Sequence, residues 1–101
     1  MPYAHDFPGV GVAAEIVLPV NKGGSYYLHR IWYSYDSKPT GGSLAVINGD
    51  GEIFRIDVTS DGPDTIEFAP LPMGGEFDSK MIVRLESGGI AVNGKLNIYY
   101  E

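Results

Sequence analysis

The chain has 101 residues, no cysteine and a formal net charge of −6, because 13 Asp and Glu outnumber 7 Lys and Arg. This length fits one domain, and the absence of cysteine excludes disulfides, zinc–thiolate sites and thiol nucleophiles. The acidic balance argues against nucleic acid and anionic membranes as partners, since both bind basic surfaces. The 14 glycines and 7 prolines recur at short intervals, which predicts many short strands joined by tight turns.

The first twelve residues, MPYAHDFPGVGV, hold two prolines and two glycines, which predicts an extended irregular arm over residues 1–12. A single domain then spans residues 13–101. Tyr3 and Phe7 make the arm more apolar than an ordinary frayed terminus. Two interpretations stay open at this point: a frayed end, or an arm that docks onto a neighbouring subunit.

Residues 13–20 form the first predicted strand, which Pro19 ends or places at a sheet edge. Residues 25–37 are rich in aromatic and β-branched side chains and form the predicted central strand, bent once near Arg30. Neither of its faces is plainly polar, so we expect it to lie between two layers or against a neighbouring chain. Strict alternation gives one face with Tyr26, Leu28, Arg30, Trp32 and Ser34, and another with Tyr27, His29, Ile31, Tyr33 and Tyr35.

The second half of the chain alternates strands and turns. Residues 43–47 and 52–59 are predicted strands, joined by the hairpin turn Asn48-Gly49-Asp50-Gly51. Further strands are expected at 65–68, 80–86 and 95–101, with a short extended piece at 90–92. Residues 69–79 form a long loop that is functional or crosses between sheets. Seven to eight strands without a helix predict an all-β fold, an antiparallel β-sandwich that is jelly-roll-like rather than immunoglobulin-like.

Three motif-like patterns fail on their context. Residues 9–14 spell a GxGxxA fingerprint, but no strand precedes it and no helix follows. Asn48, Asp50 and Glu52 alternate as calcium ligands do, but Ile53 stands where an EF-hand loop needs glycine. His29 and Asp36 are seven residues apart on one predicted strand and therefore face opposite ways. We expect no enzyme activity, no metal site and no cofactor.

The aromatic residues are the most informative feature. Seven of them lie in two predicted strands, and three interpretations remain open: a core with hydroxyls at its rim, a protein–protein interface, or a sugar-stacking surface. The seven are Tyr26, Tyr27, Trp32, Tyr33, Tyr35, Tyr99 and Tyr100.

Residues 25–101 resemble small β-rich virion proteins of tailed bacteriophages. The shared pattern is a long aromatic strand, a Pro-Thr-Gly-Gly turn, a hairpin, an Asp-Gly-Pro turn and a closing glycine-rich hairpin. In this sequence these elements are His29–Tyr35, Pro39–Gly42, Ser43–Thr59, Asp61–Phe68 and Val83–Tyr100.

The resemblance implies a capsid cement (decoration) protein on the capsid surface of the virion, which binds the major capsid protein and forms a homotrimer. The alternative is a tail or fibre accessory domain that binds carbohydrate on the host surface. The resemblance assigns no binding residue. On physical grounds, the side chains expected to contact a partner are apolar or aromatic groups of the arm, the long loop and the last strand. They are Tyr3, Phe7, Leu71, Met73, Phe77, Tyr99 and Tyr100.

Overall fold

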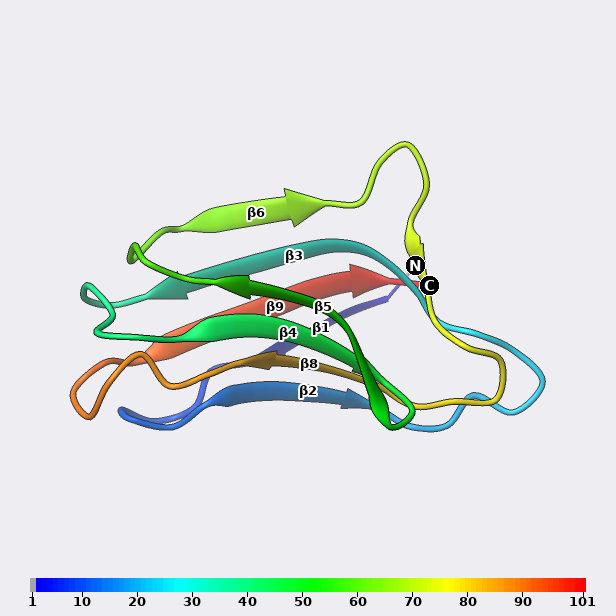
Figure 1. Cartoon of the computed structure of the whole chain (residues 1–101), viewed down its shortest axis with the longest axis horizontal. Coiled ribbons are helices and arrows are strands. Elements are labelled where there is room, and N and C mark those ends of the chain that lie inside the picture. Colours follow the sequence, from blue (N-terminus) through cyan, green and yellow to red (C-terminus); the bar gives the residue numbers. More distant parts are fainter. Residues whose placement is uncertain (1) are drawn as a thin grey trace.

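The computed structural model describes residues 2–101, which form nine strands in two antiparallel sheets. Sheet A has the order β1-β9-β3-β6, with β7 also paired to β3, and sheet B has the order β2-β8-β4-β5 (Figure 1). No helix occurs over residues 2–101, so the described chain contains none that could cross a membrane. The strands are β1 (Tyr3–Asp6), β2 (Ala14–Leu18), β3 (Tyr27–Tyr35), β4 (Ser43–Asn48), β5 (Gly51–Asp57), β6 (Asp64–Glu67), β7 (Met73–Gly74), β8 (Met81–Leu85) and β9 (Gly94–Tyr100).

The strand pairs are nested within one another. The hairpin β4–β5 is the innermost pair, and β3–β6, β2–β8 and β1–β9 follow outward along the chain, all antiparallel. Successive pairs alternate between sheet B and sheet A. The pairs β3–β9 and β4–β8 then join the halves of each sheet. The chain is therefore one long antiparallel hairpin with its turn between β4 and β5, and the two arms of this hairpin fold together into two layers.

The core lies between the two sheets and takes every second residue of the inner strands. This alternation buries one face of each strand, as the period of 2 requires. Each fully buried aliphatic side chain contributes about 1.5–3 kcal/mol of transfer free energy. The largest side chains with under 2% exposure are Leu28, Ile31, Leu44, Met81, Leu85, Leu96, Ile98, Val46 and Val83. The expected all-β fold with two antiparallel sheets is confirmed.

The central strand contains the predicted bend, but its predicted faces are partly wrong. The register between β3 and β9 shifts between Leu28 and Arg30, which makes His29 the extra residue of a β-bulge. Beyond the bulge, Ile31 is buried as Leu28 is, although strict alternation put them on opposite faces. One inserted residue exchanges the faces of everything on one side of it.

The hairpin between β4 and β5 agrees with its prediction. Asn48 pairs with Gly51, and Gly49 has φ of 62°, which glycine adopts at no steric cost. A second bulge follows, because the register shifts between Val46 and Ile47. The extra residue is Ile53, which is 43% exposed.

The expected irregular arm is wrong over Tyr3–Asp6, which forms β1 and pairs with β9 of the same chain. The edge of β9 offers unpaired backbone groups that a further strand satisfies. Asp6 then links the layers, since its Oδ2 accepts a 2.9 Å hydrogen bond from the Glu15 amide of β2. Met1, the first residue of the expected arm, lies outside the described residues. The piece expected at 90–92 is a turn, and Ile90 is 95% exposed.

The long loop of residues 69–79 does cross from sheet A to sheet B, and it adds β7 to sheet A on the way. Asn48 holds its far end. The buried side-chain amide accepts a 2.6 Å hydrogen bond from the Glu76 backbone amide and donates a 3.0 Å bond to the Lys80 carbonyl. The strands β1 and β7 bring the observed number to nine, where the sequence predicts seven to eight.

Candidate functional site

Three neighbouring strands of sheet A place aromatic side chains on its outer surface. Tyr3 of β1 is paired with Tyr99 of β9, and Tyr99 is paired in turn with Arg30 of β3. Trp32 lies two residues further along β3 and shares the face of Arg30. The bulge brings His29 to the same side, where its ring lies 5.6 Å from that of Tyr99. We call these five residues the aromatic face.

The side chains of the aromatic face touch one another. The rings of Tyr3 and Tyr99 are 4.5 Å apart, and those of Tyr3 and Trp32 are stacked at 6.2 Å. The Arg30 guanidinium lies 5.1 Å from the Trp32 ring, a cation–π distance. These contacts fix the rotamers of large rigid groups on an open surface, so a partner that binds there has little side-chain entropy to remove.

Charged groups border the aromatic face. Arg30 Nη2 lies 2.6 Å from Glu67 Oε1 of β6, and His29 Nε2 lies 3.5 Å from Glu101 Oε2. Arg30 Nε is buried without a hydrogen-bond partner among the described residues, and His29 Nε2 has the Glu101 carboxylate as its ion-pair partner.

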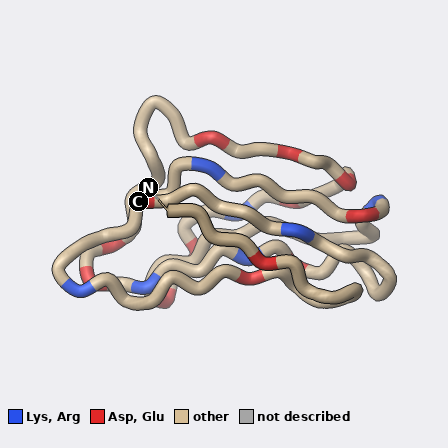
Figure 2. The backbone as a smooth tube through the Cα atoms, turned by 180° about the vertical axis from the view of Figure 1, so that it is seen from behind, with Lys and Arg blue, Asp and Glu red and all other residues tan. Residues whose placement is uncertain are grey.

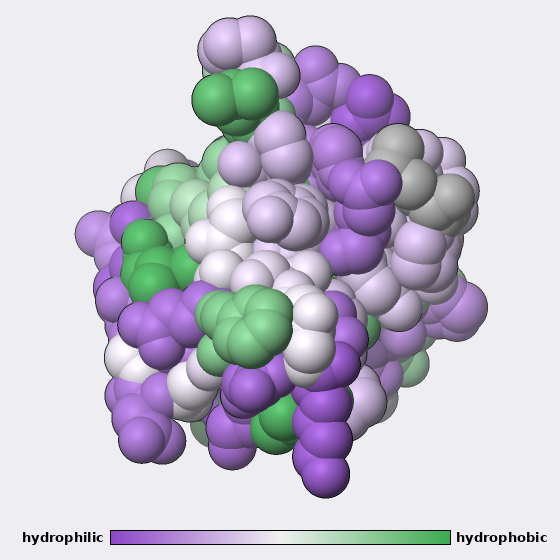
Figure 3. All heavy atoms as spheres, turned by 90° about the vertical axis from the view of Figure 1, so that its right-hand side faces the viewer, coloured by the Kyte–Doolittle hydropathy of each residue, from purple (hydrophilic) through white to green (hydrophobic). Residues whose placement is uncertain are grey.

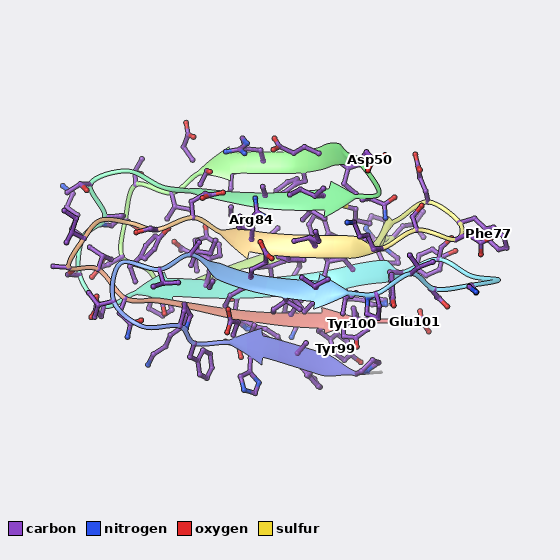
Figure 4. All side chains as sticks on the ribbon, turned by 90° about the horizontal axis from the view of Figure 1, so that it is seen from below. Asp50, Phe77, Arg84, Tyr99, Tyr100 and Glu101 are labelled. Atoms are coloured by element: carbon purple, nitrogen blue, oxygen red, sulfur yellow. The ribbon has the colours of Figure 1, made fainter. Side chains whose placement is uncertain are left out.

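The seven residues expected to contact a partner fall into three groups. Tyr3 and Tyr99 meet on the aromatic face, and Phe7 lies further along the same strand edge, stacked on His5 at 4.8 Å. Leu71 and Phe77 are 78% and 65% exposed on the long loop, with Phe77 at the tip beyond both sheets (Figure 4).

The third group serves the fold. Met73 and Tyr100 pair with Leu28 from either side, and both side chains pack against the core. We therefore assign these two residues to the stability of sheet A. Tyr3, Phe7, Tyr99, Leu71 and Phe77 remain as surface candidates.

The aromatic residues of β3 divide between core and surface. Tyr33 and Tyr35 are buried, and the Tyr35 hydroxyl donates a 2.6 Å hydrogen bond to the Glu86 carbonyl. Burial raises the pKa of Tyr35 to about 12, with smaller contributions from Glu86 and Tyr33. Burial, followed by the nearby Asp64, also raises the pKa of Tyr33. The core interpretation therefore holds for these two tyrosines, and Trp32 belongs to the open face.

Sequence reasoning missed Arg30, His29 and Glu67 as members of this surface. The sequence pattern could have identified Arg30, because Arg30 lies two residues from Trp32 on the same predicted face of the strand. The approach of Tyr3 and Glu67 depends on the strand order β1-β9-β3-β6, which no local pattern encodes.

The remaining surface offers no hollow site within residues 2–101. No pocket is found there, and no group of three or more His, Asp or Glu side chains is placed to hold a metal ion. Acidic and basic residues are interspersed along the strands (Figure 2). No protein-family model matches the chain, and no curated protein matches it.

Proposed function

We propose that the chain is a capsid cement protein of a tailed bacteriophage, which binds the major capsid protein on the outer shell and bridges neighbouring subunits. The observation that carries this proposal is the aromatic face: Tyr3, Trp32, Tyr99 and Arg30 touch one another on an outer sheet surface. Tyr, Trp and Arg are the residue types that dominate binding energy at protein interfaces. A flat partner surface suits such a face better than a small ligand does.

The strand order supports a jelly-roll form of the sandwich. With the two-residue β7 set aside, the eight other strands pair first with last, second with seventh, third with sixth and fourth with fifth. Folding a long antiparallel hairpin into two sheets in this way gives the jelly rolls that occur in viral capsid and lectin domains. The fold alone does not assign a function, so the proposal depends on the surface chemistry.

Bridging requires a second contact, and the long loop supplies a candidate. Leu71 and Phe77 are exposed on the long loop and are not members of the aromatic face. Figure 3 shows that hydrophobic side chains on the end of the molecule that faces the viewer form separate spots among polar ones. Two modest contacts made at once strengthen binding by avidity, without either having to be large.

The first test is the copy number of the chain in purified particles of the source phage, measured by quantitative mass spectrometry. Cement proteins are present in hundreds of copies, in a simple ratio to the major capsid protein. We expect that ratio. A handful of copies per particle would contradict a role on the capsid, and none would remove the virion proposal altogether.

The second test locates the contact. Tyr3→Ala and Leu71→Ala each remove one exposed side chain at little cost to the fold, and each variant is added back to shells that lack the protein. Loss of a central aromatic anchor typically weakens binding by more than about tenfold. We expect this for Tyr3→Ala. Wild-type binding by Tyr3→Ala would refute the aromatic face as the capsid contact. Weaker binding by Leu71→Ala would support the long loop as a second contact, and wild-type binding would exclude Leu71 from the contact.

One observation favours a second candidate function, carbohydrate binding by a tail or fibre accessory domain. Trp32 is partly exposed beside Asn97 and Thr65, its neighbours on β9 and β6. An aromatic ring next to amide and hydroxyl groups can stack on a sugar. Trp32 is the single tryptophan, so binding of host glycans would change a fluorescence signal that has one source. An unchanged Trp32 signal with host polysaccharide would exclude this candidate.

A further inference from the structure

The hairpin turn between β4 and β5 begins with a chemically reactive pair, Asn48-Gly49. The backbone nitrogen of the residue after an asparagine can attack the side-chain amide of that asparagine. Glycine hinders this attack least, because it has no Cβ. The chain has two such pairs, Asn48-Gly49 and Asn93-Gly94. The proposed capsid role uses neither pair, so their chemistry is a separate property of the molecule.

The surroundings of Asn48 hold both reacting groups in place. The Gly49 N–H donates a 3.0 Å hydrogen bond to the Lys80 carbonyl, and Asn48 Nδ2 donates a second 3.0 Å bond to the same oxygen. Asn48 Oδ1 accepts the 2.6 Å bond from the Glu76 amide, and the residue is only 4% exposed. The nitrogen that would attack and the nitrogen that would leave therefore share one acceptor. Neither can turn toward the other group while the end of the long loop stays in position.

We propose that Asn48-Gly49 is a modification site that becomes reactive only when residues 76–80 leave the hairpin. The reaction is spontaneous deamidation, and its one co-reactant is water. The Gly49 nitrogen loses its proton and forms a bond to Asn48 Cγ. The bond from Cγ to Nδ2 breaks, and Nδ2 takes up a proton and leaves as ammonia. Water then opens the cyclic imide at either of its carbonyls, which gives aspartate or isoaspartate without any oxidation or reduction.

Neither product fits the place of the asparagine. An aspartate at position 48 has no N–H group for the Lys80 carbonyl, and its carboxylate oxygen lies against that carbonyl oxygen instead. A charge at a residue that is 4% exposed is also poorly solvated. Isoaspartate adds a backbone atom at the end of β4 that pairs with Gly51, and this disturbs the register of the hairpin. One opening of the loop that is long enough for the reaction therefore becomes permanent.

The three hydrogen bonds set the size of the protection. Groups that react only from an open form react more slowly by the factor that favours the closed form. Three intramolecular hydrogen bonds of ordinary net strength correspond to a factor of roughly one hundred. We therefore expect deamidation of Asn48 to be about one hundredfold slower in the folded protein than in the unfolded chain.

Peptide mapping by mass spectrometry measures the reaction, because conversion of an amide to an acid changes the mass of the peptide. The purified chain is incubated in buffer and in urea at the same pH and temperature. Asn93-Gly94 is the internal reference in urea, where neither pair keeps its folded surroundings and both should react at similar rates. In buffer, the peptide that contains Asn48 should stay almost unmodified over the same time.

Gly75→Ala tests the cause of the protection. A Cβ at Gly75 would lie 2.7 Å from Asn48 Nδ2, so the added methyl group displaces the amide from its hydrogen bonds. We expect the folded variant to deamidate at Asn48 at least about tenfold faster than the wild type in buffer. Gly41→Ala is the matched control, since a Cβ there meets no atom within 4 Å, and it should react as the wild type does.

Circular dichroism establishes that Gly75→Ala is folded, and if it unfolds, the wild-type comparison between buffer and urea decides alone. Asn48→Asp reproduces one product directly and should lower the urea midpoint.

Four outcomes would each overturn the proposal. They are equal rates at Asn48 in buffer and in urea, no reaction of Asn48 in urea while Asn93 reacts, a wild-type rate in folded Gly75→Ala, and a wild-type urea midpoint for Asn48→Asp. None of these measurements involves a capsid, so this inference and the cement function fail independently.

Discussion

The Tyr35 hydroxyl gives a stability prediction that can be worked out from its surroundings. The side chain is 5% exposed, and its Oη donates a 2.6 Å hydrogen bond to the Glu86 carbonyl of the loop that follows β8. Tyr35→Phe removes the donor and leaves that carbonyl without this partner. A lost hydrogen bond of this kind costs about 1–2 kcal/mol in the free energy of unfolding.

The Tyr35 hydroxyl also makes the free energy of unfolding depend on pH in the alkaline range. The pKa of Tyr35 is raised from 10.0 to about 12, mainly by burial. A raised pKa means that the folded state holds the proton more tightly than the unfolded state does. The stabilisation is therefore complete below pH ~10 and is lost as the pH rises from about 10 to about 12. Two pKa units set an upper limit of about 2.7 kcal/mol, which solvent screening near the surface reduces, and Tyr35→Phe should no longer lose this stability over that range.

Urea unfolding followed by the fluorescence of Trp32 measures both effects. Tyr33→Phe is the matched control, since Tyr33 is buried on the same face two residues away and its hydroxyl makes no hydrogen bond to the described residues. We expect that control to change the free energy of unfolding by less than about 0.5 kcal/mol at neutral pH. Equal losses in both variants would refute the role of the Glu86 contact. An alkaline loss in Tyr35→Phe as large as in the wild type would refute the pKa assignment.

Two further changes test the loops that frame the fold. Gly42→Ala should destabilise the protein by about 2 kcal/mol or more, because Gly42 has φ of 149° and a Cβ there would lie 2.7 Å from Tyr35 Oη. Gly41→Ala next to it meets no atom within 4 Å and should change the urea midpoint little. Asn48→Ala should cost about 2–3 kcal/mol, since a buried side chain loses both of its hydrogen bonds to residues 76–80. Hydrogen exchange at the Glu76 amide should rise in that variant, and unchanged protection would contradict the anchoring role.

The sequence predicted the strands well because their signals are local. Alternation in 52–59, the Asn-Gly turn and the aromatic run of β3 each depend on neighbouring residues, and the structure has all three. The bend near Arg30 was also predicted, but its effect on the faces was not, because a bulge is set by the register with β9. β1 was missed because its partner lies at the other end of the chain and its own residues, between Pro2 and Pro8, resemble an irregular arm.

The candidate site was harder to predict than the strands. Tyr3 and Tyr99 were both selected for their chemistry, but nothing local indicates that their rings lie 4.5 Å apart. Met73 and Tyr100 look as suitable as Leu71 in the sequence, and only their positions beside Leu28 assign them to the core. Exposure is decided by the layer on which a strand packs, so a list of apolar residues cannot separate the core from the surface.

The nested pairing has a consequence for the synthesis of the protein. β1 ends at Asp6, and its partner β9 begins at Gly94. At about 5–20 residues per second, the ribosome needs roughly 4–18 s to make the residues between them. During this time the first strand has no hydrogen-bonding partner, and sheet A lacks the strand that joins β1 to β3. Folding of such a chain is controlled by contacts of very long sequence separation, which close slowly. The seven residues of β9, made last among the strands, complete the sheet to which the aromatic face belongs.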